Sequence, residues 1–185
     1  MFVFLDTEFT GLQQDTDLIS LALVDENNES FYAEFTDYRP ELVNDWVQKN
    51  VVDNLLYKGE YPFYVEKLRQ VRMKGCKEAV AEKLKHWLEH YKAVEIVADV
   101  GHYDFVLLLE LFGGALSKPK NLSAAYLDLN TIIAQAYKTT IEEAFDMSRE
   151  GILRQNKVEI DIGSKHNSLY DALISRKIFK LLHNF

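Results

Sequence analysis

Two carboxylates, Asp6 and Glu8, follow a short apolar run at residues 1–5. The run is aromatic and β-branched, so it predicts a buried strand that ends at the acids. Side chains two positions apart in a strand project to the same side, so both carboxylates should point at one place. They repel each other unless a positive charge lies between them, and Mg²⁺ or Mn²⁺ prefers oxygen ligands. The pair indicates a divalent-cation site, although two acids leaving a strand into solvent would give the same pattern.

Three more polar residues, Asp104, His166 and Asp171, stand where helices should begin. Asp104 follows a predicted strand at 94–98; taken alone, it would be interpreted as a helix-capping carboxylate. His166 and Asp171 are five positions apart, which on one helix would separate them by about 140°. They converge only if His166 lies in a loop before the helix, and the Gly-Ser pair at 163–164 supplies that break. Alone, His166 would be interpreted as a surface or capping histidine.

Together these residues fall into three motifs. Residues 6–12 (DTEFTGL) resemble the first motif of the DEDD superfamily of 3′→5′ exonucleases, Asp-x-Glu-x-Thr-Gly followed by an apolar residue. Residues 98–104 (ADVGHYD) resemble the second motif, with Tyr-Asp in place of Phe-Asp. Residues 166–172 (HNSLYDA) match the third, a histidine with four residues before an aspartate. The motifs occur in the family's order and span nearly the whole chain.

The second and third motifs narrow the resemblance. Asp99 and Val100 stand where the family usually has His-Asn, a form that looks like that of a branch of small bacterial exoribonucleases. This departure leaves Asp99 as an alternative to Asp104 in the ligand set. In a sister subgroup a tyrosine four residues before the last aspartate replaces the histidine. That position here is Asn167, so the match is to the histidine subgroup, DEDDh.

The resemblance implies a ribonuclease H-like fold and a two-metal mechanism with Mg²⁺ or Mn²⁺. The implied metal ligands are Asp6, Glu8, Asp104 and Asp171. Together with His166 as the general base, they form the implied catalytic set. The implied substrate-binding set lies in the first motif: Thr7, Phe9, Thr10, Gly11 and Leu12. Backbone donors near Thr10 would meet the 3′-hydroxyl, and Leu12 would wedge against the last base. Ordinary packing would explain Leu12 as well, and Phe9 could stack on a base or belong to the core.

The elements that must position these residues describe an α/β layer architecture. Strands are expected at 1–5, 18–24, 31–35, 94–98 and 126–129. Helices are expected at 41–50, 80–91, 104–112, 131–138 and 168–183. The second and third strands should form an antiparallel hairpin, and the fourth should lie parallel to the first. With the resemblance, the fold class is a ribonuclease H-like mixed five-stranded sheet flanked by helices. No linker or repeat interrupts the pattern, so residues 1–185 are expected to form a single exonuclease domain.

Composition is that of an ordinary soluble globular protein, with 48% hydrophobic and 27% charged residues. Cys76 alone excludes an intramolecular disulfide or a thiolate metal cluster and favours a cytoplasmic location. Neither a signal peptide nor a membrane span of roughly 20 apolar residues is expected. The net charge of −8 argues against broad adhesion to nucleic acid. A nuclease would then need a local basic path; residues 67–77 are the candidate, and a solvated loop and helix start are the alternative.

We therefore expect a metal-dependent 3′→5′ exoribonuclease that releases nucleoside 5′-monophosphates. RNA is favoured by the variant second motif and the small chain, and a DNA exonuclease of proofreading or repair type is the alternative. A non-catalytic nucleic-acid-binding module is less favoured, because it would be expected to have lost at least one of the five catalytic residues. No membrane partner is expected. A homodimer is expected by analogy with ribonuclease T and oligoribonuclease.

Overall fold

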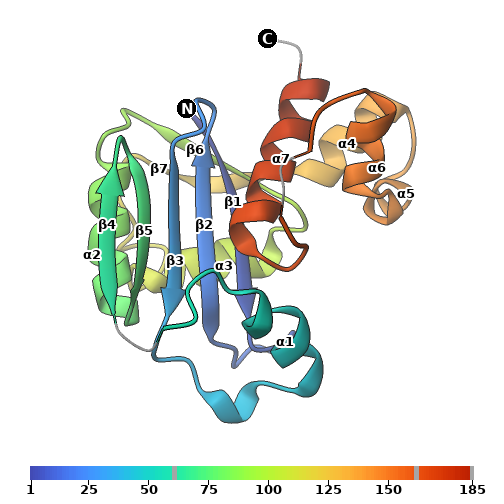
Figure 1. The fold of residues 1–185 in the computed structure, drawn as a ribbon. Coiled ribbons are helices and arrows are strands. Elements are labelled where there is room, and N and C mark those ends of the chain that lie inside the picture. Colours follow the sequence, from blue (N-terminus) through green and yellow to red (C-terminus); the bar gives the residue numbers. More distant parts are fainter. Residues whose placement is uncertain (60–61, 161–162, 184–185) are drawn as a thin grey trace.

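The structure is a computed structural model that describes residues 1–59, 62–160 and 163–183. Over these residues the chain forms a mixed sheet with helices on both faces (Figure 1). The strands are β1 (Phe2–Phe9), β2 (Leu18–Asp25), β3 (Ser30–Phe35), β4 (Phe63–Lys67), β5 (Gln70–Gly75), β6 (Val94–Ala98) and β7 (Leu122–Asp128). The helices are α1 (Asp45–Asn50), α2 (Lys77–Leu88), α3 (His102–Leu111), α4 (Leu129–Tyr137), α5 (Ile141–Asp146), α6 (Arg149–Gln155) and α7 (Ser168–Leu182).

The sheet has seven strands in the order β4-β5-β3-β2-β1-β6-β7. β2 pairs antiparallel with both β1 and β3, which confirms the expected hairpin. β6 pairs parallel with β1 and with β7, so the expected direction of the fourth predicted strand is also confirmed. β1 thus lies inside the sheet, between β2 and β6, where it can present side chains to both faces.

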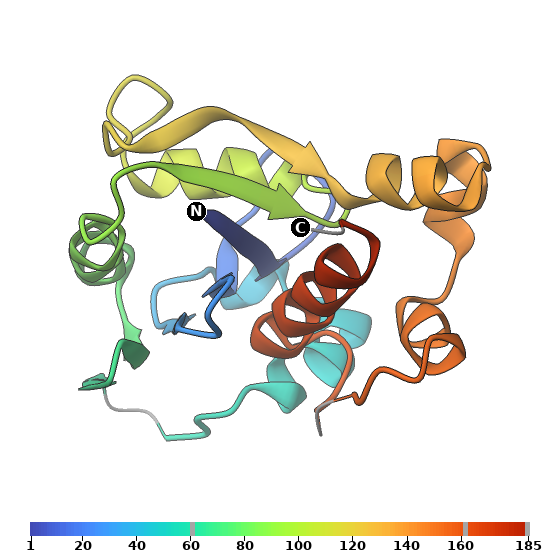
Figure 2. The same ribbon diagram turned by 90° about the horizontal axis from the view of Figure 1, so that it is seen from above.

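β1 divides its side chains between two cores. Val3 and Leu5 are buried with residues of α2 and α3, whereas Phe4 is buried with residues of α4 and α7. Figure 1 shows α7 in front of the strands and α3 behind them, and Figure 2 shows the same separation from above. Because side chains alternate along a strand, Asp6 and Glu8 share the face of Phe4. The acid pair therefore projects toward α7.

Helix α7 approaches the sheet closely because small side chains line the contact. Ser20 and Ser168 share a hydrogen bond of 2.9 Å between their hydroxyls. Ala172 is fully buried against Ala22 and the neighbouring part of β2 and β3. Small residues at a helix–sheet contact let the two backbones approach each other. This docking fixes the first turn of α7 over the centre of the sheet.

The expectation of a five-stranded sheet is wrong, because β4 and β5 extend it to seven strands. Four of the five residues of β4 are exposed, so this edge strand has no apolar alternation to reveal it. β5 does alternate, with Val71 and Met73 buried. Its intervening residues include Arg72 and Lys74, and these basic side chains favoured an interpretation as a loop. The mixed α/β class itself is confirmed.

The predicted helix at 41–50 is divided in the structure. A 3₁₀ turn at Pro40–Leu42 comes first, and α1 begins after Asn44, whose side chain accepts a hydrogen bond from the backbone N–H of Val47. α5 and α6 were not predicted, since six or seven residues are too few for a periodic apolar pattern to stand out.

Among the described residues, no helix combines the length and apolar character that crossing a membrane requires.

Candidate active site

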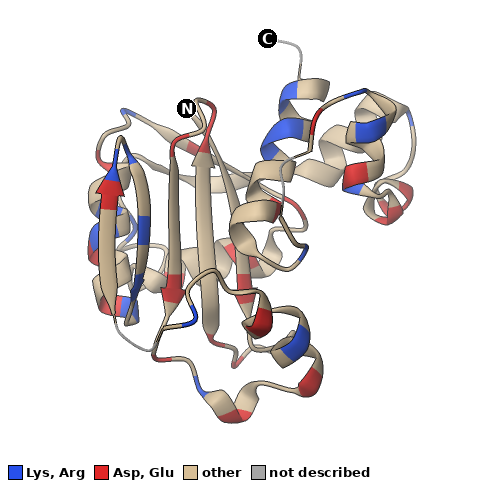
Figure 3. Ribbon diagram, viewed as in Figure 1, with Lys and Arg blue, Asp and Glu red and all other residues tan. Residues whose placement is uncertain are grey.

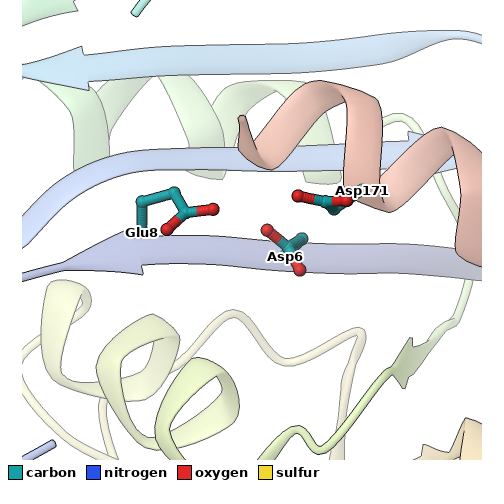
Figure 4. A group of neighbouring side chains, drawn as sticks. All are labelled: Asp6, Glu8 and Asp171. Atoms are coloured by element: carbon teal, nitrogen blue, oxygen red, sulfur yellow. The ribbon is translucent and has the colours of Figure 1, made fainter. Parts of the chain in front are cut away.

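The carboxylates of Asp6, Glu8 and Asp171 converge between β1 and the first turn of α7 (Figure 4). One oxygen from each lies within 4.8 Å of one from each of the others. The three line a cavity of about 720 Å³, a size typical of small-ligand sites. The expectation that residues 6 and 8 point to one side is thereby confirmed. An all-oxygen donor set of this kind fits a hard divalent cation.

Asp104 reaches the same cavity from the other side of β1. β6 ends at Ala98, opposite Leu5, so β1 continues beyond its partner strand. Asp104 Oδ1 accepts hydrogen bonds from the backbone N–H of Thr7 at 2.8 Å and from its hydroxyl at 2.6 Å. Gly101 is the N-cap of α3, so Asp104 does not cap that helix. Thr7 holds Oδ1, which leaves Oδ2 as the oxygen able to take a cation.

His166 lies in the loop before α7, as the spacing of the third motif required. Its φ angle is 60°, and its backbone N–H donates to Asp171 Oδ2 at 2.8 Å. The imidazole packs edge-on against Trp46 of α1, with ring centroids 5.0 Å apart. Gly163 precedes the turn; a Cβ there would lie 2.1 Å from the Tyr170 ring, so only glycine permits this close approach. The loop thus places His166 in the cavity, with its backbone bound to Asp171 and its ring against Trp46.

The electrostatics of the cavity favour a bound cation. Burial, reinforced by the charges of its acidic neighbours, raises the pKa of Asp6 well above its usual range. Burial also raises the pKa of Glu8 to about 8 and that of Asp171 to about 7. For Asp104 burial raises the pKa to about 6, against the opposing effect of the two Thr7 hydrogen bonds. These carboxylates repel each other in a low-dielectric site, and a divalent cation would relieve that repulsion.

The raised pKa values predict that, without divalent cations, the protein loses stability as the pH rises. Between the unfolded pKa near 4 and the folded values of about 7 and 8, the folded state binds more protons than the unfolded state. The free energy of unfolding therefore falls across that window. In EDTA we expect Tm to drop between pH 6 and pH 8.5, and Mn²⁺ to restore it most at pH 8.5.

Glu8→Gln should raise Tm in EDTA at pH 8.5, by about 2–4 °C for each kcal/mol of repulsion removed. Glu82→Gln is the matched control, because that carboxylate is 79% exposed on α2. Differential scanning calorimetry of both variants and the wild type measures the effect. A wild-type Tm in EDTA that stays flat from pH 6 to pH 8.5 would contradict the account.

Asp99 has a structural partner. Arg149 of α6 donates two hydrogen bonds to its carboxylate, at 2.6 and 2.8 Å, and Asn130 donates a third at 3.1 Å. Arg149 also binds the Asn130 side chain and two backbone carbonyls. A carboxylate held in this way is already neutralised by a fixed guanidinium. The geometry therefore supports Asp104 over Asp99 as the carboxylate of the second motif that serves the cavity.

Thr10 and Gly11 use their backbone donors within the loop that follows β1. The N–H of Thr10 donates to the carbonyl of Asp17 at 3.0 Å, and the N–H of Gly11 donates to the Thr16 hydroxyl at 3.0 Å. Thr10 is buried, and its hydroxyl accepts a hydrogen bond from the N–H of Asp17. In this conformation these two backbone donors close the loop and do not face the cavity. The backbone N–H and the hydroxyl of Thr7 are also used within the protein, since both donate to Asp104.

Leu12 and Phe9 lie at the cavity in different environments. Leu12 is 77% exposed, so ordinary packing does not explain it. Phe9 is partly buried and stacks on Tyr103, with ring centroids 5.3 Å apart and an interplanar angle of 22°. The Tyr103 hydroxyl donates to the carbonyl of Leu12 at 2.8 Å and so ties the two motifs together. The loop after β1 thus presents the apolar side chain of Leu12 near the stacked rings of Phe9 and Tyr103.

The lining residues that were not predicted include Trp46, Glu150 and Lys165. Trp46 is 55% exposed and lies on α1, within the helix predicted at 41–50, but nothing in its local sequence links it to the cavity. Glu150 is buried in the first turn of α6 and pairs with Lys165 at 3.2 Å. None belongs to a recognisable motif. A Ser-x-Glu helix start at 148–150 was the one signal available for Glu150.

The basic segment at 67–77 does not lead to the cavity. Its residues belong to β4, β5 and α2, at the edge of the sheet away from α7 (Figure 3). Three of its cations are engaged locally: Arg69 with Glu29 at 2.7 Å, Lys74 with the carbonyl of Tyr57 at 3.0 Å, and Lys77 with Asp17 at 3.0 Å. None of its residues lines the cavity, so the structure favours the alternative that the segment is a structural part of the sheet edge.

Comparison with known proteins gives both sequence and fold relatives. The chain is 29% identical over 125 residues to a 3′-5′ exoribonuclease of Mycobacterium tuberculosis, found in strains CDC 1551 and H37Rv. The match covers 64% of this chain and 66% of the relative, just under two thirds of that protein's length. No protein-family model matches the chain.

Among solved structures, the nuclease domain of 3′hExo, a DEDDh family member bound to rAMP, aligns with a TM-score of 0.61. Its identity is 12%, over 99% of this chain and 92% of that one. A 3′-exonuclease that recognises a histone mRNA stem-loop aligns with a TM-score of 0.62 at 14% identity, over 99% and 82% of the two chains. Exonuclease I aligns with a TM-score of 0.58 at 14% identity, over 98% and 42%. The fold is therefore the ribonuclease H-like exonuclease fold. The chain is thus similar in fold to a DEDDh family member and in sequence to a 3′-5′ exoribonuclease.

Proposed function

We propose that residues 1–185 form a single exonuclease domain that removes nucleoside 5′-monophosphates from the 3′ end of RNA. The observation that carries the proposal is the convergence of Asp6, Glu8 and Asp171 in one cavity with Asp104 and His166. The proposed ligands of two Mg²⁺ or Mn²⁺ ions are Asp6, Glu8, Asp104 and Asp171. Ions held there would supply Lewis-acid activation of the attacking water and stabilisation of charge on the leaving 3′ oxygen.

His166 is the proposed general base. Burial and the neighbouring charge of Lys165 lower the pKa of its imidazole, so the ring is neutral at pH 7 and able to accept a proton. A ring nitrogen would take the proton from the attacking water. Asp171 holds the backbone of His166, and Trp46 packs against the ring, so the base is positioned before substrate arrives.

The apolar walls of the cavity suit the last nucleobases of a strand. We assign Leu12, which is exposed, as the wedge against the terminal base. Phe9 and Tyr103 form one stacked aromatic surface of the cavity, and exposed Trp46 offers a second one. Base–aromatic stacking is worth about 1–3 kcal/mol per base and tolerates any sequence. This arrangement supports binding of an unpaired 3′ end.

RNA is the preferred substrate because the sequence relative is named an exoribonuclease. A DNA exonuclease is the second candidate, since exonuclease I of E. coli shares the fold and has been solved with a DNA oligonucleotide. Matched RNA and DNA oligomers of one sequence, single-stranded or with a 3′ overhang, decide between them in Mg²⁺, with EDTA as the metal-free control. We expect faster shortening of RNA; faster shortening of DNA would favour the second candidate. Binding without shortening in Mn²⁺ would instead indicate a non-catalytic module.

A homodimer and a cytoplasmic location stay predictions from the family resemblance and the cysteine content. They do not enter the chemistry proposed above, because every residue of the proposed site comes from one chain.

A further inference from the structure

The cavity is rich in acids, and its cations therefore matter for a polyanionic substrate. Six carboxylates line it: Asp6, Glu8, Asp99, Asp104, Glu150 and Asp171. Among the described residues, two permanently charged cations line it as well, Arg149 and Lys165. Two divalent cations would offset much of the negative charge, but RNA phosphates outside the metal site would still need a positive partner.

The guanidinium of Arg149 already binds other groups of the protein. Its guanidinium holds the carboxylate of Asp99, the side chain of Asn130 and the backbone carbonyls of Ala144 and Met147. Its side chain is 14% exposed. Moving it toward a ligand would leave Asp99 without its cation and α6 without its anchor, which is costly for a partly buried ion pair. Arg149 therefore fixes α6 and does not serve the substrate.

Lys165 is placed differently. Its side chain is 61% exposed, and its ammonium lies 3.2 Å from Glu150 Oε2. Glu150 is buried in the first turn of α6, the helix that Arg149 anchors, so the acid is a fixed point. An ammonium group has three donors, and the bond to Glu150 uses one of them. The exposed side of the group remains available to a ligand in the cavity.

The position of Lys165 in the chain places it beside the proposed chemistry. It directly precedes His166, whose backbone N–H binds Asp171. Lys165 lines the same cavity as His166 and the four proposed metal ligands. A phosphate that approaches the four carboxylates therefore also approaches Lys165.

We propose that Lys165, oriented by Glu150, binds a phosphate oxygen of the RNA next to the scissile bond. This inference rests on the proposed function and adds a substrate-binding residue to it. Lys165 is then a contact to the backbone of the strand, indifferent to base identity. Glu150 is a positioning residue, which keeps the ammonium at the cavity wall when no substrate is bound.

The test compares single-stranded RNA binding by wild type, Lys165→Met and Lys165→Arg over a series of salt concentrations. Ca²⁺ replaces Mg²⁺ so that binding is measured without turnover, by fluorescence anisotropy. Lys165→Met should raise Kd about 10-fold and lower the slope of log K against log salt by about 0.7, the value of one lost phosphate contact on a single strand. Lys165→Arg should keep most of the slope. Lys180→Met, an exposed lysine near the end of α7, is the matched control and should leave both quantities unchanged.

A double variant separates the loss of a phosphate contact from the effect of leaving the Glu150 carboxylate without its lysine. Lys165→Met leaves Glu150 as a buried anion without its lysine, which could weaken RNA binding by itself. In Lys165→Met/Glu150→Gln that charge is removed, and the slope should stay lowered if Lys165 contacts phosphate. A double variant with the Kd and slope of wild type, or a Lys165→Met slope equal to wild type, would overturn the inference. Wild-type protein that shortens RNA in Mg²⁺ keeps the proposed function intact in either case, so the two can fail separately.

Discussion

Replacing Asp6 by alanine should abolish shortening of RNA while the protein stays folded. Asp6 lies at the centre of the acidic group, with carboxylate oxygens of Glu8 and Asp171 within 4.8 Å. Its ionisation is opposed by burial and by these neighbours, so removing it relieves repulsion in the absence of metal and takes away a proposed ligand in its presence. Gel analysis of 5′-labelled RNA with Mg²⁺ measures the loss, and circular dichroism reports the fold.

Two variants make this prediction specific. Asp171→Ala should behave like Asp6→Ala, because both are proposed ligands of the same ions. Glu82→Ala removes an exposed carboxylate of α2 and should keep wild-type activity. In both ligand variants Mn²⁺ should raise Tm less than in wild type, since a cation stabilises the folded state only as far as it binds there. Turnover by purified Asp6→Ala or Asp171→Ala would refute the assignment of the metal ligands.

His166→Ala should lower kcat by about 10²- to 10⁴-fold, the usual contribution of a positioned general base. The expected effect is on kcat, because His166 binds Asp171 through its backbone N–H, and alanine retains that group. The proposed metal site should therefore survive, and Mn²⁺ should still raise Tm as in wild type. Steady-state kinetics at pH 7.5 measures kcat and KM separately.

The control for this variant is His86→Ala, because His86 is exposed on α2 and lies outside the cavity. It should retain the wild-type kcat. If kcat of His166→Ala stays near wild type at neutral pH, His166 is not the base. A loss of the Mn²⁺ effect on Tm would instead mean that the ring of His166 supports the metal site.

The convergence of the four acids and His166 could be predicted from sequence, because each of these residues lies near the start or end of a helix or strand. Asp6 and Glu8 converge through strand alternation, which depends only on their spacing. Asp171 and His166 required a loop before the last helix, and the glycine at 163 supplied it. Asp104 needed one contact that spacing does not reveal, the pair of hydrogen bonds from Thr7.

The cavity residues that could not be predicted from the sequence reach the cavity through tertiary packing. Trp46 comes from a short helix far from every motif, and Glu150 from a helix of seven residues fixed by the Arg149–Asp99 pair. No local pattern states that either segment folds over the cavity. Strand β4 was not predicted for a related reason: it is exposed at the sheet edge, so its sequence lacks the apolar alternation of a half-buried strand.

The polarity and the product of the reaction decide whether the protein is a metal-dependent 3′→5′ exonuclease. One RNA oligomer is labelled at the 5′ end in one sample and at the 3′ end in another, and both are incubated with wild-type protein in Mg²⁺ or EDTA. We expect a stepwise ladder from the 5′-labelled strand, immediate release of the 3′ label as a nucleoside 5′-monophosphate, and neither in EDTA. Release of a 5′-terminal mononucleotide, internal cleavage, or equal shortening in EDTA would contradict it.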